Sequence, residues 1–241
     1  MTESFRIALA GNPNTGKSTL FNLLTGLKQH TGNWAGKTVD LKVGTFSFKT
    51  NQYEMIDLPG TYSLFSNSKD EQIARDYIVF EKPDVTLVVL DATALERNMN
   101  LALQVMEITD RLIICINLID EAEKLGIKIN EKILMKRLGV PVIKISARNK
   151  SGIPMLLDTI DRVVSGAIKC TPYQMTYDEE TEQKIRLLLP SVQKISGDQF
   201  PARWLSLRLL DGDKKLLQKI QQKITTMGGQ KDGNTISIQA K

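Results

Sequence analysis

Short apolar runs alternate with helical patterns along the chain from Arg6 to Val164. The runs favour β-strands, and apolar residues recur at helical spacing in the segments between them, as Leu20, Leu23 and Leu24 do. The predicted strands are Arg6–Ala10, Val39–Phe48, Tyr53–Ile56, Val85–Asp91, Leu112–Asn117 and Val142–Ser146. The predicted helices are Lys17–Thr25, Met99–Thr109, Asn130–Leu138 and Ile153–Val164.

Two of these strands indicate the kind of sheet. Val85–Asp91 and Leu112–Asn117 are continuously apolar and end in polar residues. Parallel strands that are buried on both faces have this character. Together with the alternation of strands and helices, they predict an α/β fold with a mostly parallel, doubly wound sheet.

The pattern changes after Ser165, and no strand-like run occurs between Thr171 and Lys223. Three helices are predicted there, at Glu179–Leu189, at Ala202–Leu210 and from a cap at Asp213 to about Lys223. Pro190 is expected to end or kink the first of them. We therefore predict a first domain at residues 1–168, a small all-α domain at 169–226 and a disordered tail at 227–241.

Composition agrees with a folded protein. Of the 241 residues, 41% are hydrophobic and 24% are charged, so a sizeable core is expected. The longest apolar runs, Val85–Leu90 and Leu112–Ile116, are too short to span a bilayer, and Ile7–Ala10 is too short for a signal peptide. The net charge of +5 is compatible with nucleic acid or a membrane surface, but a solvated surface is the simpler explanation. Cys115 and Cys170 are interpreted as free thiols of a reducing compartment.

A phosphate-binding motif follows the first predicted strand. The segment Gly11-Asn12-Pro13-Asn14-Thr15-Gly16-Lys17-Ser18 fits G-x-x-x-x-G-K-[ST], and a helix follows directly. Glycines let backbone N–H groups wrap the β-phosphate, and the helix N-terminus adds its positive end. Lys17 should reach the β- and γ-phosphates, and the Ser18 hydroxyl should ligate Mg²⁺. The nucleotide-binding residues predicted here are Gly11, Asn14, Thr15, Gly16, Lys17, Ser18 and Thr19.

Two further elements predict contacts with Mg²⁺ and the γ-phosphate. In Asp57-Leu58-Pro59-Gly60, Asp57 would hold Mg²⁺ through water, and the Gly60 N–H would contact the γ-phosphate. Thr38 precedes the second strand, where its hydroxyl can ligate Mg²⁺ and its N–H the γ-phosphate. Because it would do so only with GTP bound, residues 32–38, with Gly36 among the nucleotide-binding residues, are predicted to order and disorder with the nucleotide.

Two elements at later strand ends predict the base. The carboxylate of Asp120, in Asn117-Leu118-Ile119-Asp120, can accept both N1–H and N2–H of guanine, whereas adenine offers neither donor there. The usual signature is N-K-x-D, and Leu118 replaces a lysine that covers the base. Ser146 and Ala147 end the next strand, where the Ala147 N–H would approach guanine O6. Five elements in this order predict a guanine-nucleotide-binding domain.

The segments around these motifs resemble the cytoplasmic N-terminal part of the FeoB family of bacterial ferrous-iron transporters. The resemblance rests on Gly11-Asn-Pro-Asn, Gly32-Asn-Trp-Ala-Gly, Asp57-Leu-Pro-Gly-Thr-Tyr-Ser-Leu64, Asp70-Glu71-Gln72-Ile73-Ala74, Asp91-Ala-Thr-Ala-Leu-Glu-Arg-Asn98 and Arg203-Trp204-Leu205-Ser206-Leu207-Arg208-Leu209-Leu210 with Asp213. It implies a P-loop NTPase domain of the Ras-like type, followed by a helical domain that favours GDP binding. Three features depart from the family: Lys37 at a usually apolar position, Leu118 where methionine is frequent, and Pro190 within a helix.

The resemblance also implies partners and a location. The chain would be a soluble piece at the cytoplasmic face of the bacterial inner membrane. Its partners would be GTP and the membrane transport domain of the same polypeptide, which carries Fe²⁺, with a homo-oligomer as a further candidate and no nucleic acid.

Hydrolysis is expected to be slow. Tyr62 stands where many GTPases place a glutamine that orients water, and no arginine finger is evident. By resemblance to potassium-stimulated GTPases, Asn14 is a candidate K⁺ ligand, with the carbonyls of Gly32 and Trp34 completing the shell. Lys17, Thr38 and Asn14 are therefore the predicted catalytic residues.

Two alternatives remain open from the sequence. An RNA-binding GTPase of ribosome assembly would carry a compact basic β- or KH-type module after the nucleotide-binding domain, whereas the predicted appendage is helical and lacks a GXXG loop. A nucleotide-binding scaffold without turnover would bind GTP and release no phosphate.

Overall fold

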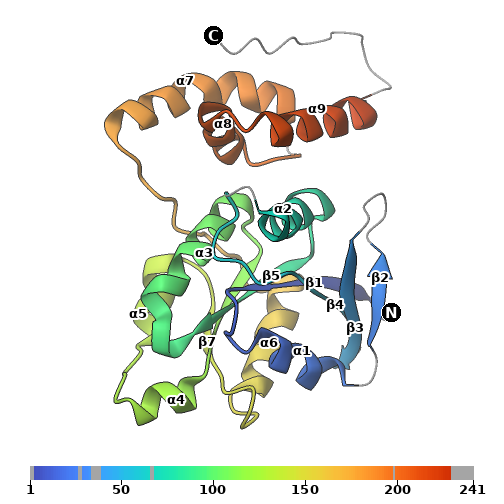
Figure 1. The fold of residues 1–241 in the computed structure, drawn as a ribbon, viewed down its shortest axis with the longest axis vertical. Helices are drawn as coiled ribbons and strands as arrows, with labels where there is room; N and C mark the ends of the chain where they lie inside the picture. Colours follow the sequence, from blue (N-terminus) through green and yellow to red (C-terminus); the bar gives the residue numbers. More distant parts are fainter. Residues whose placement is uncertain (1–2, 27–28, 34–38, 66–67, 198, 229–241) are drawn as a thin grey trace. The chain divides into compact units, whose positions relative to one another are not determined.

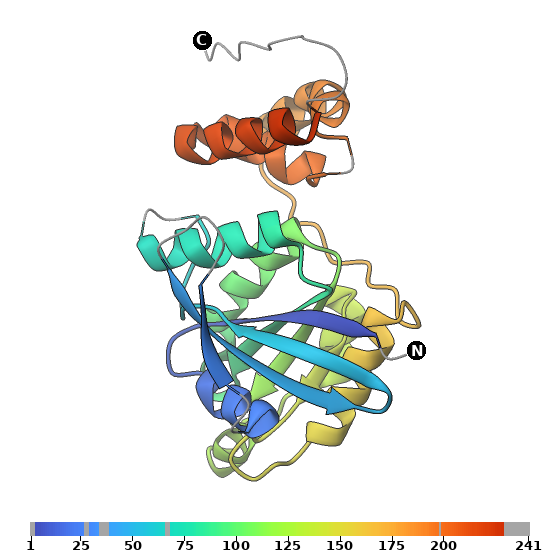
Figure 2. The ribbon, with the colours of Figure 1, turned by 90° about the vertical axis from the view of Figure 1, so that its right-hand side faces the viewer.

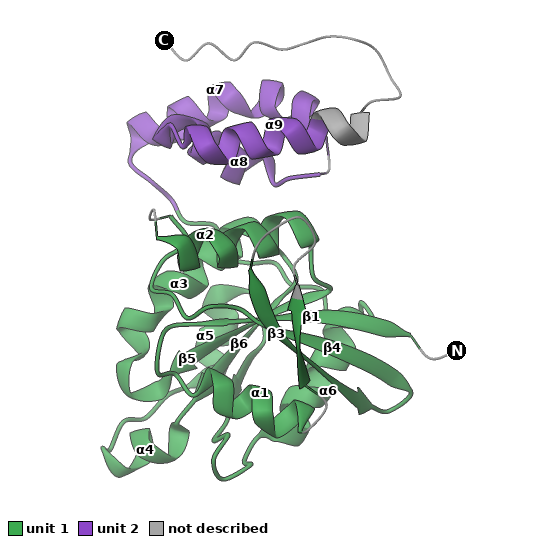
Figure 3. Ribbon diagram, turned by 45° about the vertical axis from the view of Figure 1, so that its right-hand side comes forward, with its two compact units in different colours: residues 1–175 green, residues 176–241 purple. Residues whose placement is uncertain are grey.

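The computed structural model describes residues 3–26, 29–33, 39–65, 68–197 and 199–228. The chain forms two compact units, Met1–Met175 and Thr176–Lys241 (Figure 3). The domain boundary predicted after residue 168 lies slightly before the boundary between these two units, which follows Met175. Cys170 packs against the core of the first unit, and Thr171 N–H and Tyr173 N–H donate to the carbonyls of Gly139 and Leu138, each at 2.9 Å. Residues 169–175 therefore pack on the first unit.

Within the described residues, the first unit contains a seven-stranded sheet in the order β2-β3-β4-β1-β5-β6-β7 (Figures 1 and 2). The strands are β1 Ser4–Gly11, β2 Gln29–Asn33, β3 Asp40–Phe48, β4 Asn51–Asp57, β5 Val85–Asp91, β6 Leu112–Asn117 and β7 Val142–Lys144. From β4 through β1, β5 and β6 to β7 every pair is parallel, while β3 pairs antiparallel with both β2 and β4. The prediction of a mostly parallel α/β sheet is confirmed.

Helices cover both faces of this sheet, as the continuous apolar strands require. They are α1 Lys17–Thr25, α2 Lys69–Asp76, α3 Leu95–Ile108, α4 Ile119–Lys124, α5 Glu131–Leu138 and α6 Ile153–Val164. Helices α1 and α6 lie on one face, and α2 and α3 lie on the other (Figures 1 and 2). Under α1 and α6, the core gathers Leu9 and Leu87 of the central strands with Phe21 and Ile160 of the helices, all at most 1% exposed. This packing fixes the strand ends from which the polar loops emerge.

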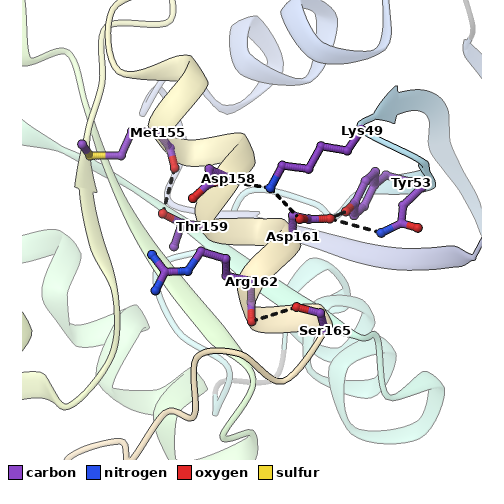
Figure 4. A network of polar contacts seen from close by, with 9 residues as sticks. Lys49, Tyr53, Met155, Asp158, Thr159, Asp161, Arg162 and Ser165 are labelled. Carbon is purple, nitrogen blue, oxygen red and sulfur yellow. Dashed lines mark hydrogen bonds and ion pairs between the residues drawn. The ribbon is translucent and has the colours of Figure 1, made fainter.

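The β3–β4 hairpin is tied to α6 by a polar cluster centred on Asp161 (Figure 4). Lys49 Nζ lies 2.8 Å from both Asp158 Oδ1 and Asp161 Oδ2. Tyr53 OH and Asn51 Nδ2 donate to Asp161 Oδ1 at 2.7 and 3.1 Å. Burial alone would raise the pKa of Asp161, but the hydrogen bonds from Lys49, Tyr53 and Asn51 outweigh it and hold the pKa below its ordinary value.

Several elements of the first unit were not predicted. Helix α2 is mostly polar, begins where Ser68 Oγ accepts from Glu71 N–H at 3.2 Å, and continues as a π-helical turn, Tyr77–Glu81. The strand β2 and the helix α4 are short and polar, so they carry little periodic signal. A 3₁₀ turn at Ala92–Ala94 leads into α3, which therefore begins before the predicted Met99.

The second unit is helical throughout its described residues, as predicted. It consists of α7 Glu179–Ser196, α8 Ala202–Asp211 and α9 Lys214–Gly228. Asp213 caps α9 by accepting from Leu216 N–H at 3.0 Å, as expected. Helix α9 includes Met227 and Gly228, which the sequence assigns to the tail, and residues 229–241 lie outside the described residues.

Pro190 was expected to end or kink the helix that begins at Glu179; an end at Leu189 is wrong, because α7 continues through Pro190 to Ser196. Proline removes the N–H that would bond to the Arg186 carbonyl. The helix is exposed on this side, where Leu187 is 79% accessible, so water can reach that carbonyl. Ile185 and Val192, on either side of the proline, are buried and hold the helix in its unit. Among the described residues, no helix is both long and apolar enough to cross a membrane.

Candidate nucleotide-binding site

The predicted phosphate-binding loop connects β1 to α1. Asn14 and Gly16 both have positive φ, at 65° and 76°, so the backbone coils into the loop just before the helix begins. A Cβ on Gly16 would collide with Asn117 Nδ2, and one on Gly11 would lie 2.7 Å from the Val89 carbonyl. Thr15 Oγ1 closes the loop by donating to the Asn12 carbonyl at 3.0 Å. The two motif glycines are therefore required by close approach of neighbouring strand ends.

Lys17 lies at the start of α1 and contacts the end of β4. Its ammonium forms an ion pair with Asp57 Oδ1 and donates to the Leu58 carbonyl at 2.7 Å. The side chains of Lys17 and Asp57 are only 10% and 8% exposed. The structure thus brings together the two charges that we predicted would hold phosphate and metal.

Gly60 lies directly against the phosphate-binding loop. A Cβ placed on it would be 3.3 Å from Pro13 N, and Thr61 N–H donates to the Gly11 carbonyl at 3.2 Å. The next residues are held by α3, because Gln104 Oε1 accepts from Leu64 N–H at 2.7 Å. Gln104 was missed in the sequence, where a single glutamine in a helical pattern gives no signal.

Asn117 joins the phosphate loop to the loop after β7. Its Nδ2 donates to the Thr15 carbonyl at 2.9 Å, and its Oδ1 accepts from Ala147 N–H at 3.0 Å. The side chain is 1% exposed. Since Ala147 N–H is already paired with Asn117, a purine carbonyl would have to share that donor. Asn117 therefore braces both halves of the candidate site.

Asp120 lies in the first turn of α4, after Leu118, whose φ is 61°. Its Oδ2 accepts from Asn149 Nδ2 at 3.1 Å. Its Oδ1 is buried and has no hydrogen-bond partner among the residues that the structure describes. The carboxylate thus has one oxygen held by Asn149 and one buried oxygen that is unpaired among the described residues.

The loop after β7 carries Ser146, another predicted site residue. Ser146 is 1% exposed, and its Oγ accepts from Asn149 N–H at 3.2 Å. It shapes the loop that holds Asn149. Asn149 itself belongs to none of the sequence motifs, and only its position opposite Asp120 singles it out.

The residues expected to hold Mg²⁺ supply the right chemistry. Ser18 is exposed in the first turn of α1, and the Asp57 carboxylate lies beside Lys17. A hydroxyl and a carboxylate are the hard oxygen ligands that Mg²⁺ binds together with substrate phosphates. Within the described part of the chain, no cluster of three or more His, Cys, Asp or Glu side chains is suited to a metal ion.

The remaining predicted residues are only partly described. The side chains of Asn14 and Thr19 are exposed at the loop and the first turn of α1. Gly32 lies in β2 opposite Leu41. Trp34, Gly36 and Thr38 lie outside the described residues, as does Lys37.

Comparison with known families agrees with this arrangement over both units. The family model of ferrous iron transport protein B matches residues 5–160, and that of the FeoB cytosolic helical domain matches residues 177–234. The chain is 41% identical to the Fe(2+) transporter FeoB of Escherichia coli K12 over 215 residues, which are 86% of this chain and 27% of that protein. It is 36% identical to the Fe(2+) transporter FeoB of Staphylococcus aureus strain COL over 217 residues, which are 90% of this chain and 32% of that protein. The chain thus spans less than a third of either relative.

Solved structures are similar over the same range. The cytosolic domain of T. maritima FeoB in a GDP form has a TM-score of 0.81 at 36% identity, covering 92% of this chain and 86% of that one. The G domain of FeoB from Methanococcus jannaschii has a TM-score of 0.61 at 48% identity, and the match covers 68% of this chain and 99% of that one. Because sequence, sheet and helical unit all agree, the chain belongs to the FeoB family of ferrous iron transport proteins.

Proposed function

We propose that this chain binds GTP and GDP and hydrolyses GTP slowly, as the regulatory domain of a bacterial ferrous-iron membrane transporter. The observation that carries the proposal is Asp120 Oδ1, a buried carboxylate oxygen without a hydrogen-bond partner in the described residues. It is linked to the phosphate-binding loop through the buried amide of Asn117. T. maritima FeoB has been solved in GDP forms, and an S. thermophilus NFeoB variant has been solved bound to GDP, which supports a guanine nucleotide.

Different residues would bind the phosphates, the base and the metal ion. The backbone of residues 11–18 and the ammonium of Lys17 would bind the phosphates. Asp120 would accept N1–H and N2–H of guanine, with Leu118 covering the base and Ser146 and Ala147 at its O6 edge. Ser18 and Asp57, with Thr38, would hold Mg²⁺, and Gly36 and Gly60 would approach the γ-phosphate. When bound, Mg²⁺ supplies charge neutralisation on the phosphates.

The slow rate proposed for GTP hydrolysis follows from the side chain of Tyr62, two residues after Gly60. Tyr62 stands where a glutamine would orient water; its side chain is 49% exposed, with the Arg97 guanidinium 5.6 Å from its ring centre. A phenol that stacks against an arginine is poorly suited to orient a nucleophilic water. We assign Asn14, with the carbonyls of Gly32 and Trp34, as the residues that would hold a K⁺ ion, which would supply positive charge beside the phosphates and so raise the rate.

Phosphate release tests this function. With purified chain, GTP should be hydrolysed and ATP should not, and K⁺ should give a higher rate than Na⁺. Asn14→Ala should keep GTP binding and lose the difference between K⁺ and Na⁺. Equal rates with both cations in the wild type would overturn the K⁺ site, and equal turnover of GTP and ATP would overturn the assignment of the base.

The helical second unit, which lies within the 169–226 domain predicted from the sequence together with the tail, is assigned the role of favouring GDP. The whole chain would act at the cytoplasmic face of the inner membrane, passing its nucleotide state to a membrane transport domain of the same polypeptide. A ribosome-assembly GTPase is not favoured, because the described part of the second unit is helical and carries no β-rich module. GTP binding without phosphate release would indicate a scaffold instead.

A further inference from the structure

The loop after β7 is closed by its own hydrogen bonds. Ser146 and Ser151 each donate a backbone N–H to the carbonyl of the other at 3.1 Å. Within the loop, Lys150 adopts a φ of 58°, and Asn149 N–H donates to Ser146 Oγ at 3.2 Å. Gly152, at a φ of 74°, allows the chain to pass close to β7, where a Cβ would collide with the Lys144 carbonyl. These bonds and backbone conformations therefore fix where the loop places Asn149.

This loop directs one side chain at the predicted base-reading carboxylate. Asn149 Nδ2 donates to Asp120 Oδ2 at 3.1 Å, across 29 residues of sequence. The backbones beneath are also joined, since Ile119 N–H donates to the Ile145 carbonyl at 3.3 Å. Two neighbouring strand ends thus hold the two side chains opposite each other.

We propose that Asn149 is a positioning residue for base selection, which fixes the rotation of the Asp120 carboxylate so that it meets the N–H edge of a guanine. This inference rests on the proposed function. An ionised carboxylate has about four lone-pair sites, so Oδ2 can accept from Asn149 and from one base N–H together. Oδ1, buried and without a hydrogen-bond partner among the described residues, is left for the second base N–H.

Asn149 would raise the affinity for guanine nucleotides by preorganising the Asp120 carboxylate. A carboxylate at the start of a short helix can rotate about its terminal bond, and a ligand that must stop this rotation binds less tightly. With Asn149 in place, that cost is met before the nucleotide arrives. Because only the guanine edge uses both acceptors, the benefit falls on guanine nucleotides more than on nucleotides that lack one of these donors.

Calorimetric titration with GDP, IDP and ADP tests the inference, since IDP lacks the 2-amino group. For Asn149→Ala, we expect GDP binding to weaken by about three- to tenfold, the range of one hydrogen bond, with a smaller loss for IDP. Asn149→Asp should weaken GDP binding further, because it replaces the donor with a second negative charge. Asn149→Gln keeps an amide donor and should recover part of the affinity. Lys150→Gln, in the same exposed loop, is the matched control and should keep the affinity ratio of GDP to IDP.

The outcomes distinguish a failure of the role of Asn149 from a failure of the proposed function. If Asn149→Ala weakens GDP and IDP by the same factor, or neither, Asn149 does not position Asp120 and the inference is overturned. If the wild type binds ADP as tightly as GDP, the proposed function fails first. A circular dichroism melt of each variant shows whether the unit is folded, and the ratio between ligands is read only from folded protein.

Discussion

Lys17 and Asp57 form an ion pair that joins the start of α1 to the end of β4. The same ammonium also donates to the Leu58 carbonyl, one residue further along the chain. The lysine proposed to bind phosphate and the carboxylate proposed to hold Mg²⁺ therefore neutralise each other in this structure. A nucleotide with its metal would replace this pair with two new ones, phosphate on Lys17 and Mg²⁺ on Asp57.

Lys17→Ala should reduce the affinity for GTP by about tenfold to a hundredfold, because a hydrogen-bonded charge on the phosphates is lost. It should also lower the free energy of unfolding, since Asp57 is nearly buried and would lose its partner. Titration calorimetry and urea unfolding measure the two effects. Lys136→Ala, on the exposed side of α5, is the control, and an unchanged GTP affinity in Lys17→Ala would contradict the role of the loop.

Asp120→Asn should change which base is preferred. An amide can donate to the C2 carbonyl of xanthine, whereas it cannot accept both N–H groups of guanine. We expect GDP affinity to fall by about tenfold to a hundredfold and XDP to become the tighter ligand. Competition against a fluorescent nucleotide would show this. If GDP stayed preferred over XDP, Asp120 would not be the base-reading residue.

Asp161→Ala should destabilise the first unit by about 1–2 kcal/mol, because Tyr53, Asn51 and Lys49 all lose their acceptor. Asp158→Ala is the matched control: this carboxylate is 48% exposed and bonds to Lys49, so its removal should cost less than about 1 kcal/mol. Equal losses in urea unfolding would show that Asp161 has no special role in the hairpin contact.

The Asp161 carboxylate also makes the stability of the first unit depend on pH. Its pKa is held below the ordinary value, so its contribution is present above that value and lost as the pH falls through the lowered pKa. Tyr53 acts in the opposite direction: burial, with the bond to Asp161, raises its pKa to about 12, and its contribution is lost as the pH rises from about 10 towards 12. Tyr53→Phe should reduce the alkaline loss of stability in unfolding measurements and leave the share of Tyr77, whose pKa burial also raises to about 12.

The second unit should lose stability in strong acid through Glu182. Hydrogen bonds from Arg203, at 2.9 and 2.6 Å, and from Tyr177 N–H lower the pKa of Glu182 to about 2. Its contribution is complete above its ordinary pKa of 4.5 and disappears as the pH falls towards 2. Helical circular dichroism of wild type and Glu182→Gln would follow it. A variant with the same acid dependence as wild type would exclude Glu182 as the titrating group.

The main features of the fold and the site could be predicted because they depend on local chemistry. Parallel strands end at one edge of the sheet, so the motifs that follow β1, β4, β6 and β7 had to meet there. Gln104 and Asn149 could not be found in this way, because an amide acquires its role only from a partner far along the chain. The polar strand β2 and the passage of α7 through Pro190 likewise depend on neighbours that a local pattern does not contain.

The close contact between Gly139 and Thr171 determines how the chain leaves the first unit. A Cβ on Gly139 would collide with the Thr171 carbonyl, and the two hydrogen bonds from Thr171 and Tyr173 hold this stretch on the end of α5. Tension applied to the chain beyond Met175 would therefore load these two bonds before it reached α6. Gly139 lies just before β7, which neighbours β6, the strand that carries Asn117, and is separated by β6 and β5 from β1, which leads into the phosphate-binding loop.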